Sequence, residues 1–198
     1  MRQRRTQRLS RRWIVAGLVA VALMGAIVGC GDKEPDDSGT EGLSAEQRFE
    51  EGNDYYQQGN LDNAASSFEA ALKLEPRHLG SLTNLGVVYY QLGRLEDAVG
   101  QFEAGLEVDS SDAQLHYLLG AARLQQSRYE DAERSFLQAK GLQPDLPEVH
   151  FGLGALYKLQ GKTDEAIAAF ERFLELGPAQ DPRASEEAER ELLELRGQ

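Results

Sequence analysis

Small and aromatic residues recur in this chain at a fixed interval of 34 residues. Three columns are unbroken over four copies, and their members are Gly52, Gly86, Gly120 and Gly154, then Ala64, Ala98, Ala132 and Ala166, then Phe68, Phe102, Phe136 and Phe170. Self-similarity at such a period is typical of solenoids, in which each repeat is one supersecondary unit stacked on its neighbours. The period therefore predicts a stacked array.

The residues between these columns predict two helices in each repeat. We expect first helices near 45–58, 79–92, 113–126 and 147–160, and second helices near 61–74, 95–108, 129–142 and 163–176. A glycine inside a helix costs about 1 kcal/mol relative to alanine. Gly86 and its equivalents therefore indicate a close approach of the two helices, which recovers packing energy. Gly93, with Gly59 and Gly161 in its column, falls where the first helix should end and predicts a left-handed cap.

The motif Leu85-Gly86-x-x-Tyr89, followed by Ala98-x-x-x-Phe102 and, in most copies, by a proline, resembles the tetratricopeptide repeat. This resemblance implies an all-α, right-handed solenoid of helix-turn-helix units. Four repeats fit, at 45–78, 79–112, 113–146 and 147–180. The tryptophan usual near the start of the motif is replaced by Arg48, Leu82, His116 and His150, so we expect the packing there to differ between repeats.

A final helix is expected within residues 181–198, where Asp181 and Pro182 supply an N-cap and a first-turn proline. A terminal repeat needs a half-polar cap because its last apolar face has no neighbour. The apolar stripe of this helix would consist of Ala184, Ala188, Leu192 and Leu195. The acidic sequence at 186–191 is expected to fill the exposed face.

The N-terminal residues 1–29 have the layout of a signal peptide, with six arginines followed by an uncharged apolar run at 13–29. That run is 17 residues long, at the short edge of what spans a bilayer. The residues Ile27-Val28-Gly29-Cys30 resemble the lipobox of bacterial lipoproteins, which implies cleavage before an acylated Cys30. Residues 30–44 would then form the lipidated cysteine and a disordered tether. An uncleaved membrane anchor is the alternative.

The route of export stays open. Ser10-Arg11-Arg12 resembles the start of a twin-arginine signal, but arginines also supply the ordinary basic region of a signal peptide. By either route, the body is expected in the bacterial cell envelope, held at a membrane by lipid and facing the periplasm. Inner and outer membrane are not distinguished by these residues.

Charge and cysteine content exclude several classes of function. The formal net charge is −12, and all six arginines of residues 1–29 lie outside the acidic body. A body this acidic repels phosphate backbones, which disfavours nucleic-acid binding. Because Cys30 is the only cysteine, neither an intramolecular disulfide nor a cysteine metal cage can form.

No catalytic motif stands out, and we expect neither an enzyme nor a cofactor. The runner-up interpretation is a metal-dependent enzyme using His116 and His150, which share one repeat position. Both stand where the family packs an aromatic, and no third ligand accompanies them. Packing is therefore the favoured role for both histidines.

The resemblance also implies a concave groove lined by the first helices. The expected partner-binding residues are Phe49, Asn53, Tyr56, Asn84, Val87, Tyr90, Tyr117, Leu124 and Phe151. The chaperone-binding members carry a clamp of cations, whereas Phe49, Gln114 and Leu118 stand at those positions here. A groove of this kind in an acidic body suits an apolar helix or an extended segment with basic flanks.

Together these features predict a non-catalytic scaffold or assembly factor that holds a protein partner. Small lipoproteins of this kind resemble the pilotin and assembly lipoproteins of pilus, secretion and exopolysaccharide machines. The alternative is an uncleaved, membrane-anchored adaptor with a chaperone-like role.

Overall fold

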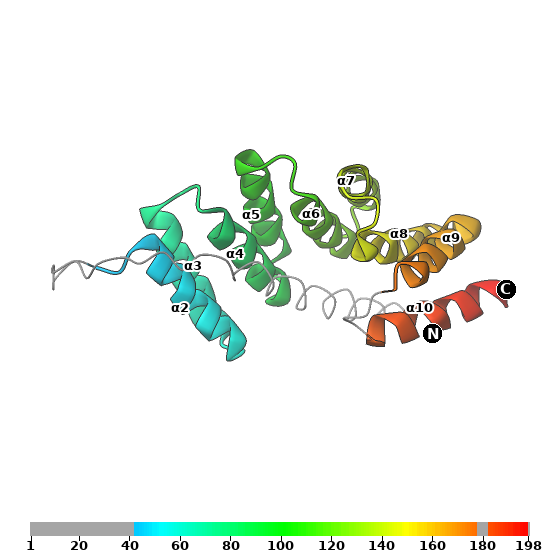
Figure 1. Ribbon diagram of the computed structural model, residues 1–198, viewed down its shortest axis with the longest axis horizontal. Helices are drawn as coiled ribbons and strands as arrows, with labels where there is room; N and C mark the ends of the chain where they lie inside the picture. Colours follow the sequence, from blue (N-terminus) through cyan, green and yellow to red (C-terminus); the bar gives the residue numbers. More distant parts are fainter. Residues whose placement is uncertain (1–41, 178–181, 198) are drawn as a thin grey trace.

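The computed structural model describes residues 42–177 and 182–197 (Figure 1). All regular structure in these two ranges is helical. The elements are α2 (Ala45–Gln57), α3 (Leu61–Leu74), α4 (Leu79–Gln91), α5 (Leu95–Val108), α6 (Ala113–Gln125), α7 (Tyr129–Leu142), α8 (Pro147–Gln160), α9 (Thr163–Glu175) and α10 (Pro182–Arg196). The predicted ends of the eight paired helices are therefore correct to within one residue.

The helices form four antiparallel pairs that follow one another along the molecule (Figure 1). Within each repeat the first helix packs on the second, and the second then packs on the first helix of the next repeat. Successive first helices also contact one another, from α2 to α4, α6 and α8. No two second helices of the described residues have comparable contact, so the first helices lie on the inner side of the array.

The recurring glycines make room for the recurring phenylalanines. A β-carbon on Gly86 would lie 2.5 Å from Cε1 of Phe102, and one on Gly120 would lie 2.6 Å from Phe136. All four phenylalanines of this column are at most 1% exposed. The predicted close approach is confirmed, and the packing of a whole aromatic ring offsets the helix propensity lost at each glycine.

Three of the four first helices are followed by a glycine in the left-handed region. Gly59, Gly93 and Gly161 have φ of 75°, 76° and 73°, which confirms the predicted caps. The third repeat has Ser127 at this position with φ of 62°, although it is not a glycine. The cap geometry is therefore set by the fold of the repeat rather than by the residue that occupies the position.

The packing at the tryptophan column differs between repeats, as expected, although the third and fourth repeats share one arrangement. His116 and His150 each donate a hydrogen bond from Nε2 to a backbone carbonyl six residues earlier, on Ser110 at 3.1 Å and on Pro144 at 2.8 Å. Leu82 is buried, and Arg48 instead pairs with Glu51 at 2.9 Å. The histidines thus hold the loop that precedes their own helix.

The C-terminal helix α10 packs on α9 as a cap. Ala188, Leu192 and Leu195 are buried, and Ala184 packs against the core, as predicted. The prediction that the acidic side chains of this helix are exposed is wrong for Glu187 and Glu191, which are 6% and 9% exposed.

Each of these two carboxylates has a cationic partner. Glu191 pairs with Lys158 of α8, which also contacts Glu194 at 2.8 Å, and Glu187 pairs with Arg190 one turn along its own helix. An ion pair offsets the loss of hydration that burial imposes on a carboxylate. The cap is consequently held by charge as well as by its apolar stripe.

Some predictions concern residues outside the described ranges. These are the signal peptide at 1–29, Cys30, the tether up to residue 41, Pro178 and Asp181. Among the helices that the structure does describe, none combines the length and the apolar character needed to cross a membrane.

Candidate functional site

The inner face of the array is crossed by amide hydrogen bonds between successive first helices. Asn84 donates from Nδ2 to Oδ1 of Asn53 at 2.7 Å, and Gln91 donates from Nε2 to Oη of Tyr56 at 2.6 Å. Both bonds join α2 to α4. The two bonds bring together four residues on or beside the predicted groove. They also fix the first two repeats relative to each other.

Three of the predicted groove aromatics face the second helix of their own repeat. Phe49 lies 5.8 Å from Phe68, Tyr117 lies 6.0 Å from Phe136, and Phe151 lies 5.6 Å from Phe170, measured between ring centroids. Tyr117 and Phe151 are only 3% and 9% exposed. These rings therefore pack toward the second helix of their own repeat, and their assignment to the partner-binding groove stays a prediction.

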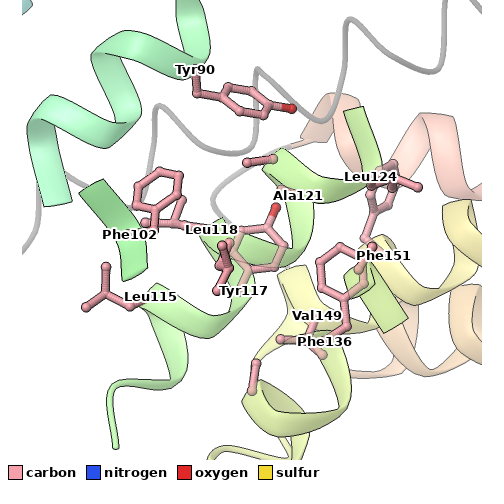
Figure 2. Close-up of a cluster of buried hydrophobic side chains, with 14 of the residues drawn as sticks. Tyr90, Phe102, Leu115, Tyr117, Leu118, Ala121, Leu124, Phe136, Val149 and Phe151 are labelled. Carbon is pink, nitrogen blue, oxygen red and sulfur yellow. The ribbon is translucent and has the colours of Figure 1, made fainter. Parts of the chain in front are cut away.

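The centre of the inner face is apolar and is supplied by α4 and α6. Val87 and Tyr90 of α4 are 1% and 3% exposed in the full-length chain, and Ala121 and Leu124 of α6 are 0% and 3% exposed. Figure 2 shows Tyr90, Ala121 and Leu124 in one cluster with Tyr117 and Phe151. Toward the ends of the array, the equivalent positions are only partly buried, at Asn53, Tyr56, Ala155 and Lys158.

Burial perturbs the titrating groups of this region. Burial raises the pKa of Tyr90, and hydrogen bonding with Gln125 offsets this rise only in part. Burial also raises the pKa of Tyr117, and the nearby charge of Glu148 raises it further. Desolvation also raises the pKa of Glu148 itself. Tyr90 and Tyr117 therefore stay neutral at any physiological pH.

The sequence analysis did not single out Gln91, Ala121 or Glu148 of this site, and of these three Glu148 has the most unusual environment. Its Oε2 atom is buried and has no hydrogen-bond partner among the described residues. The signal was available, because Glu148 stands at the second position of its repeat, which the family places on the concave face. A buried carboxylate oxygen without a partner is rare in folded proteins.

The chemistry of this face is that of a binding surface. It offers apolar side chains, neutral amides and tyrosine hydroxyls, and the described residues contain no group of three or more histidine, cysteine, aspartate or glutamate side chains that could hold a metal ion. His116 and His150 are accounted for by their bonds to loop carbonyls. Both histidines thus bond to the loop that precedes their own helix, with His150 buried and His116 half-buried.

Solved structures with this fold come from several bacteria. The Thermus thermophilus protein TTC0263, described as a thermophilic TPR protein, is 23% identical, with a TM-score of 0.64 over 76% of this chain and 80% of that chain. Pseudomonas aeruginosa pilF is 26% identical, with a TM-score of 0.67 over 77% and 69%. A MamA fragment from Desulfovibrio magneticus RS-1 is 26% identical, with a TM-score of 0.64 over 69% and 77%. Comparison with curated proteins found no match.

The sequence also matches a family model described as tetratricopeptide repeat over residues 49–113, 92–147 and 117–181. These segments overlap and together cover more than half of the chain, including nearly all of the four helix pairs. With the 34-residue columns and the stacked helix pairs, they establish that the chain belongs to the tetratricopeptide repeat family.

Proposed function

We propose that this protein is a membrane-tethered, non-catalytic scaffold that holds a protein partner on the inner face of its repeat array. The observation that carries the proposal is the apolar centre formed by Val87, Tyr90, Ala121 and Leu124 on the face that the first helices share. Tetratricopeptide arrays act through such protein-protein interfaces, and the described residues offer no competing reactive centre.

The chemistry of the face defines the partner. Its centre is apolar, its fringe is made of the amides of Asn53, Asn84 and Gln91, and the body around it is acidic. An amphipathic or apolar helix with basic flanks would bury its apolar side here and would be attracted by the surrounding charge.

The location rests on the N-terminal sequence. The lipobox-like residues ending at Cys30 support lipid attachment in the bacterial envelope with the array facing the periplasm. We extend the proposal to an assembly role in a pilus, secretion or exopolysaccharide machine, by the resemblance to small assembly lipoproteins. Mass spectrometry of the mature N-terminus tests the tether: an acylated Cys30 supports it, and an intact Met1 favours the uncleaved anchor.

Site-specific crosslinking in intact cells tests the binding face. A photoreactive side chain in place of Tyr56, which is partly buried on the inner face, should yield one specific adduct. The matched control is the same side chain in place of Leu137, which is 46% exposed on the second helix α7 and should yield none. Adducts that form only from Leu137, or equally from both positions, would contradict an inner binding face.

A further inference from the structure

We propose that copies of this chain bind one another head to tail, with the C-terminal helix α10 of one copy lying across the outer face of α7 in the next. Each copy then offers one surface of each kind. Neither surface includes the first helices of the array, so this contact leaves the inner face free and goes beyond the partner-binding function.

The outer face of α7 differs from that of the other three second helices. Leu137 stands where the other repeats have a glutamate, and Gly141 stands where they have a charged residue. The equivalent residues are Glu69, Glu103 and Glu171 for the first position, and Lys73, Glu107 and Glu175 for the second. Because the two positions are four residues apart, they lie on one face of the helix. The third repeat has therefore lost both charges from a surface that the other repeats keep charged.

This apolar surface of α7 is open to solvent. Leu137 and Leu142 are 46% and 44% exposed, so neither completes the core of the array. A β-carbon on Gly141 would meet no atom within 4 Å, so this glycine does not make room for a neighbour in its own chain, in contrast to Gly86. The space beside Leu137 is therefore available to a side chain of another molecule. A bulky photoreactive group in place of Leu137 would fill that space, so the crosslinking control on α7 is expected to stay free of adducts.

A lysine gives this surface its charge. Lys140 is exposed, whereas the other three repeats have at this position a leucine that packs on the core. Within the described residues, the ion pairs of α7 are made by Asp131 and Glu133 and do not include Lys140. An apolar surface beside an unpaired cation favours an acidic ligand. The chain itself is acidic, with a formal net charge of −12, so a second copy is a ligand of the required sign.

The helix α10 offers the complementary surface. Leu193 is 74% exposed, more than any other large hydrophobic side chain in the described residues. Glu189 and Glu186 precede it by one and two turns on the same face, and both are exposed. The arginines Arg190 and Arg196 are each engaged by a carboxylate of their own chain. The exposed stripe of α10 is therefore a leucine next to two carboxylates that form no ion pair with the described residues.

The placement of the two helices requires that the contact join different copies. Figure 1 shows α7 and α10 on opposite sides of the array, so the two surfaces of one copy cannot meet. Between two copies, an antiparallel crossing that sets Leu193 beside Leu137 also brings Glu189 next to Lys140, because both charges lie about one turn from their leucine. A parallel crossing would instead bring Arg196 next to Lys140. Charge therefore selects the antiparallel arrangement.

The contact is heterologous, because α7 of one copy binds α10 of another. Such contacts repeat from copy to copy and give open chains or, where the rotation closes, rings. A single pair of helix faces buries less than the roughly 1,600 Å² of a standard interface, so one contact is expected to be weak. Association should therefore increase steadily with protein concentration.

Sedimentation equilibrium of the full-length chain in detergent, over a wide range of concentration, tests this proposal. We expect the average mass to rise beyond that of two copies. Leu137→Glu installs the residue of the other three repeats, and it should lower the association constant by about tenfold or more. Leu193→Glu places a charge in the stripe of α10 and should have the same effect.

The matched control is Leu74→Glu, because Leu74 is 59% exposed on α3 and lies outside both surfaces. This variant should associate as the unmodified chain does. Circular dichroism confirms that each variant retains its helices. A chain that stays monomeric at all concentrations would overturn the proposal, and so would an equal loss of association in Leu74→Glu.

A mixing experiment distinguishes this contact from a symmetric one. The Leu137→Glu variant keeps an intact α10, and the Leu193→Glu variant keeps an intact α7. Each variant alone should stay monomeric, whereas their mixture should form a complex of one copy of each and nothing larger. Self-association that persists in either variant alone would show an α7–α7 or α10–α10 contact instead and would overturn the head-to-tail arrangement.

The antiparallel arrangement is tested by exchanging charges. Lys140→Glu and Glu189→Lys should each weaken association several-fold, because each sets two like charges side by side. Both changes in one chain should restore association to near the level of the unmodified chain. Losses that simply add in the double variant would show that Lys140 and Glu189 do not meet, and would overturn the proposed contact.

Discussion

The ring of Phe102 lies against the backbone of Gly86, at a place where a β-carbon on the glycine would come within 2.5 Å of the ring. The same relationship is repeated three more times, between Gly52 and Phe68, Gly120 and Phe136, and Gly154 and Phe170. Each repeat therefore depends on a glycine, although glycine is unfavourable in an isolated helix. Because the glycine has no side chain, the phenylalanine ring fits against its backbone.

This relationship predicts that Gly86→Ala destabilises the array by about 1–3 kcal/mol, since the new methyl group overlaps a ring that has no space to move. Gly100 is the matched control. It lies within α5, and a β-carbon there would meet no atom within 4 Å, so Gly100→Ala should stabilise by about 1 kcal/mol through helix propensity alone. Urea unfolding measures both. Equal effects of the same sign would contradict the packing role of Gly86.

Ser127 is predicted to be a point of backbone strain. It adopts φ of 62° at a cap position where the other repeats have glycine. Ser127→Gly should stabilise the protein by about 1 kcal/mol, because the left-handed conformation carries no steric cost in glycine. The reverse exchange, Gly93→Ser, should destabilise by a similar amount. A stability loss in Ser127→Gly would mean that the serine side chain contributes more than its backbone conformation costs.

The sequence predicted the helices, their caps and the glycine-phenylalanine packing because each of these is repeated, and the period identifies equivalent positions. It did not predict which positions face which neighbour. The contacts of Tyr117 and Phe151 with the phenylalanines of the second helices, for example, were not part of the prediction. Glu187 and Glu191 were assigned to solvent, and the sequence does not show that Lys158 of α8 stands opposite Glu191.

Arg123 occupies a repeat position where the other three repeats have tyrosine, and we predict that it maintains the same contact between repeats. It stands in the column of Tyr89, whose hydroxyl donates to Glu69 at 2.6 Å, and it donates instead to Glu103, one repeat later, at 2.7 Å. It also donates to Ser135 at 2.8 Å. Arg123→Ala should therefore destabilise by about 1 kcal/mol.

The conservative control for this site is Arg123→Tyr, which restores the hydroxyl found in the neighbouring repeats and should recover most of the loss. Thermal melts of both variants beside the unmodified chain give the comparison. If the tyrosine variant is no more stable than the alanine variant, the contact between repeats is specific to the guanidinium group.

Glu148 predicts how stability depends on pH. Burial raises the pKa of this carboxyl above its ordinary value, so the folded state binds the proton more tightly than the unfolded state does. The contribution is therefore favourable when the group is protonated, and it is lost as the pH rises from the unfolded pKa through the folded pKa. Above that window the folded protein contains a poorly solvated carboxylate.

Glu148→Gln removes this charge and should raise the free energy of unfolding at pH 7 by on the order of 1 kcal/mol. The gain should shrink as the pH falls toward the ordinary pKa of glutamate, where the native side chain is itself protonated. Urea unfolding between pH 4 and 8 measures the difference.

Glu50, which is exposed on α2, is the matched control, and Glu50→Gln should show no such trend. A gain that is constant with pH would show that burial of Glu148 costs the folded state nothing.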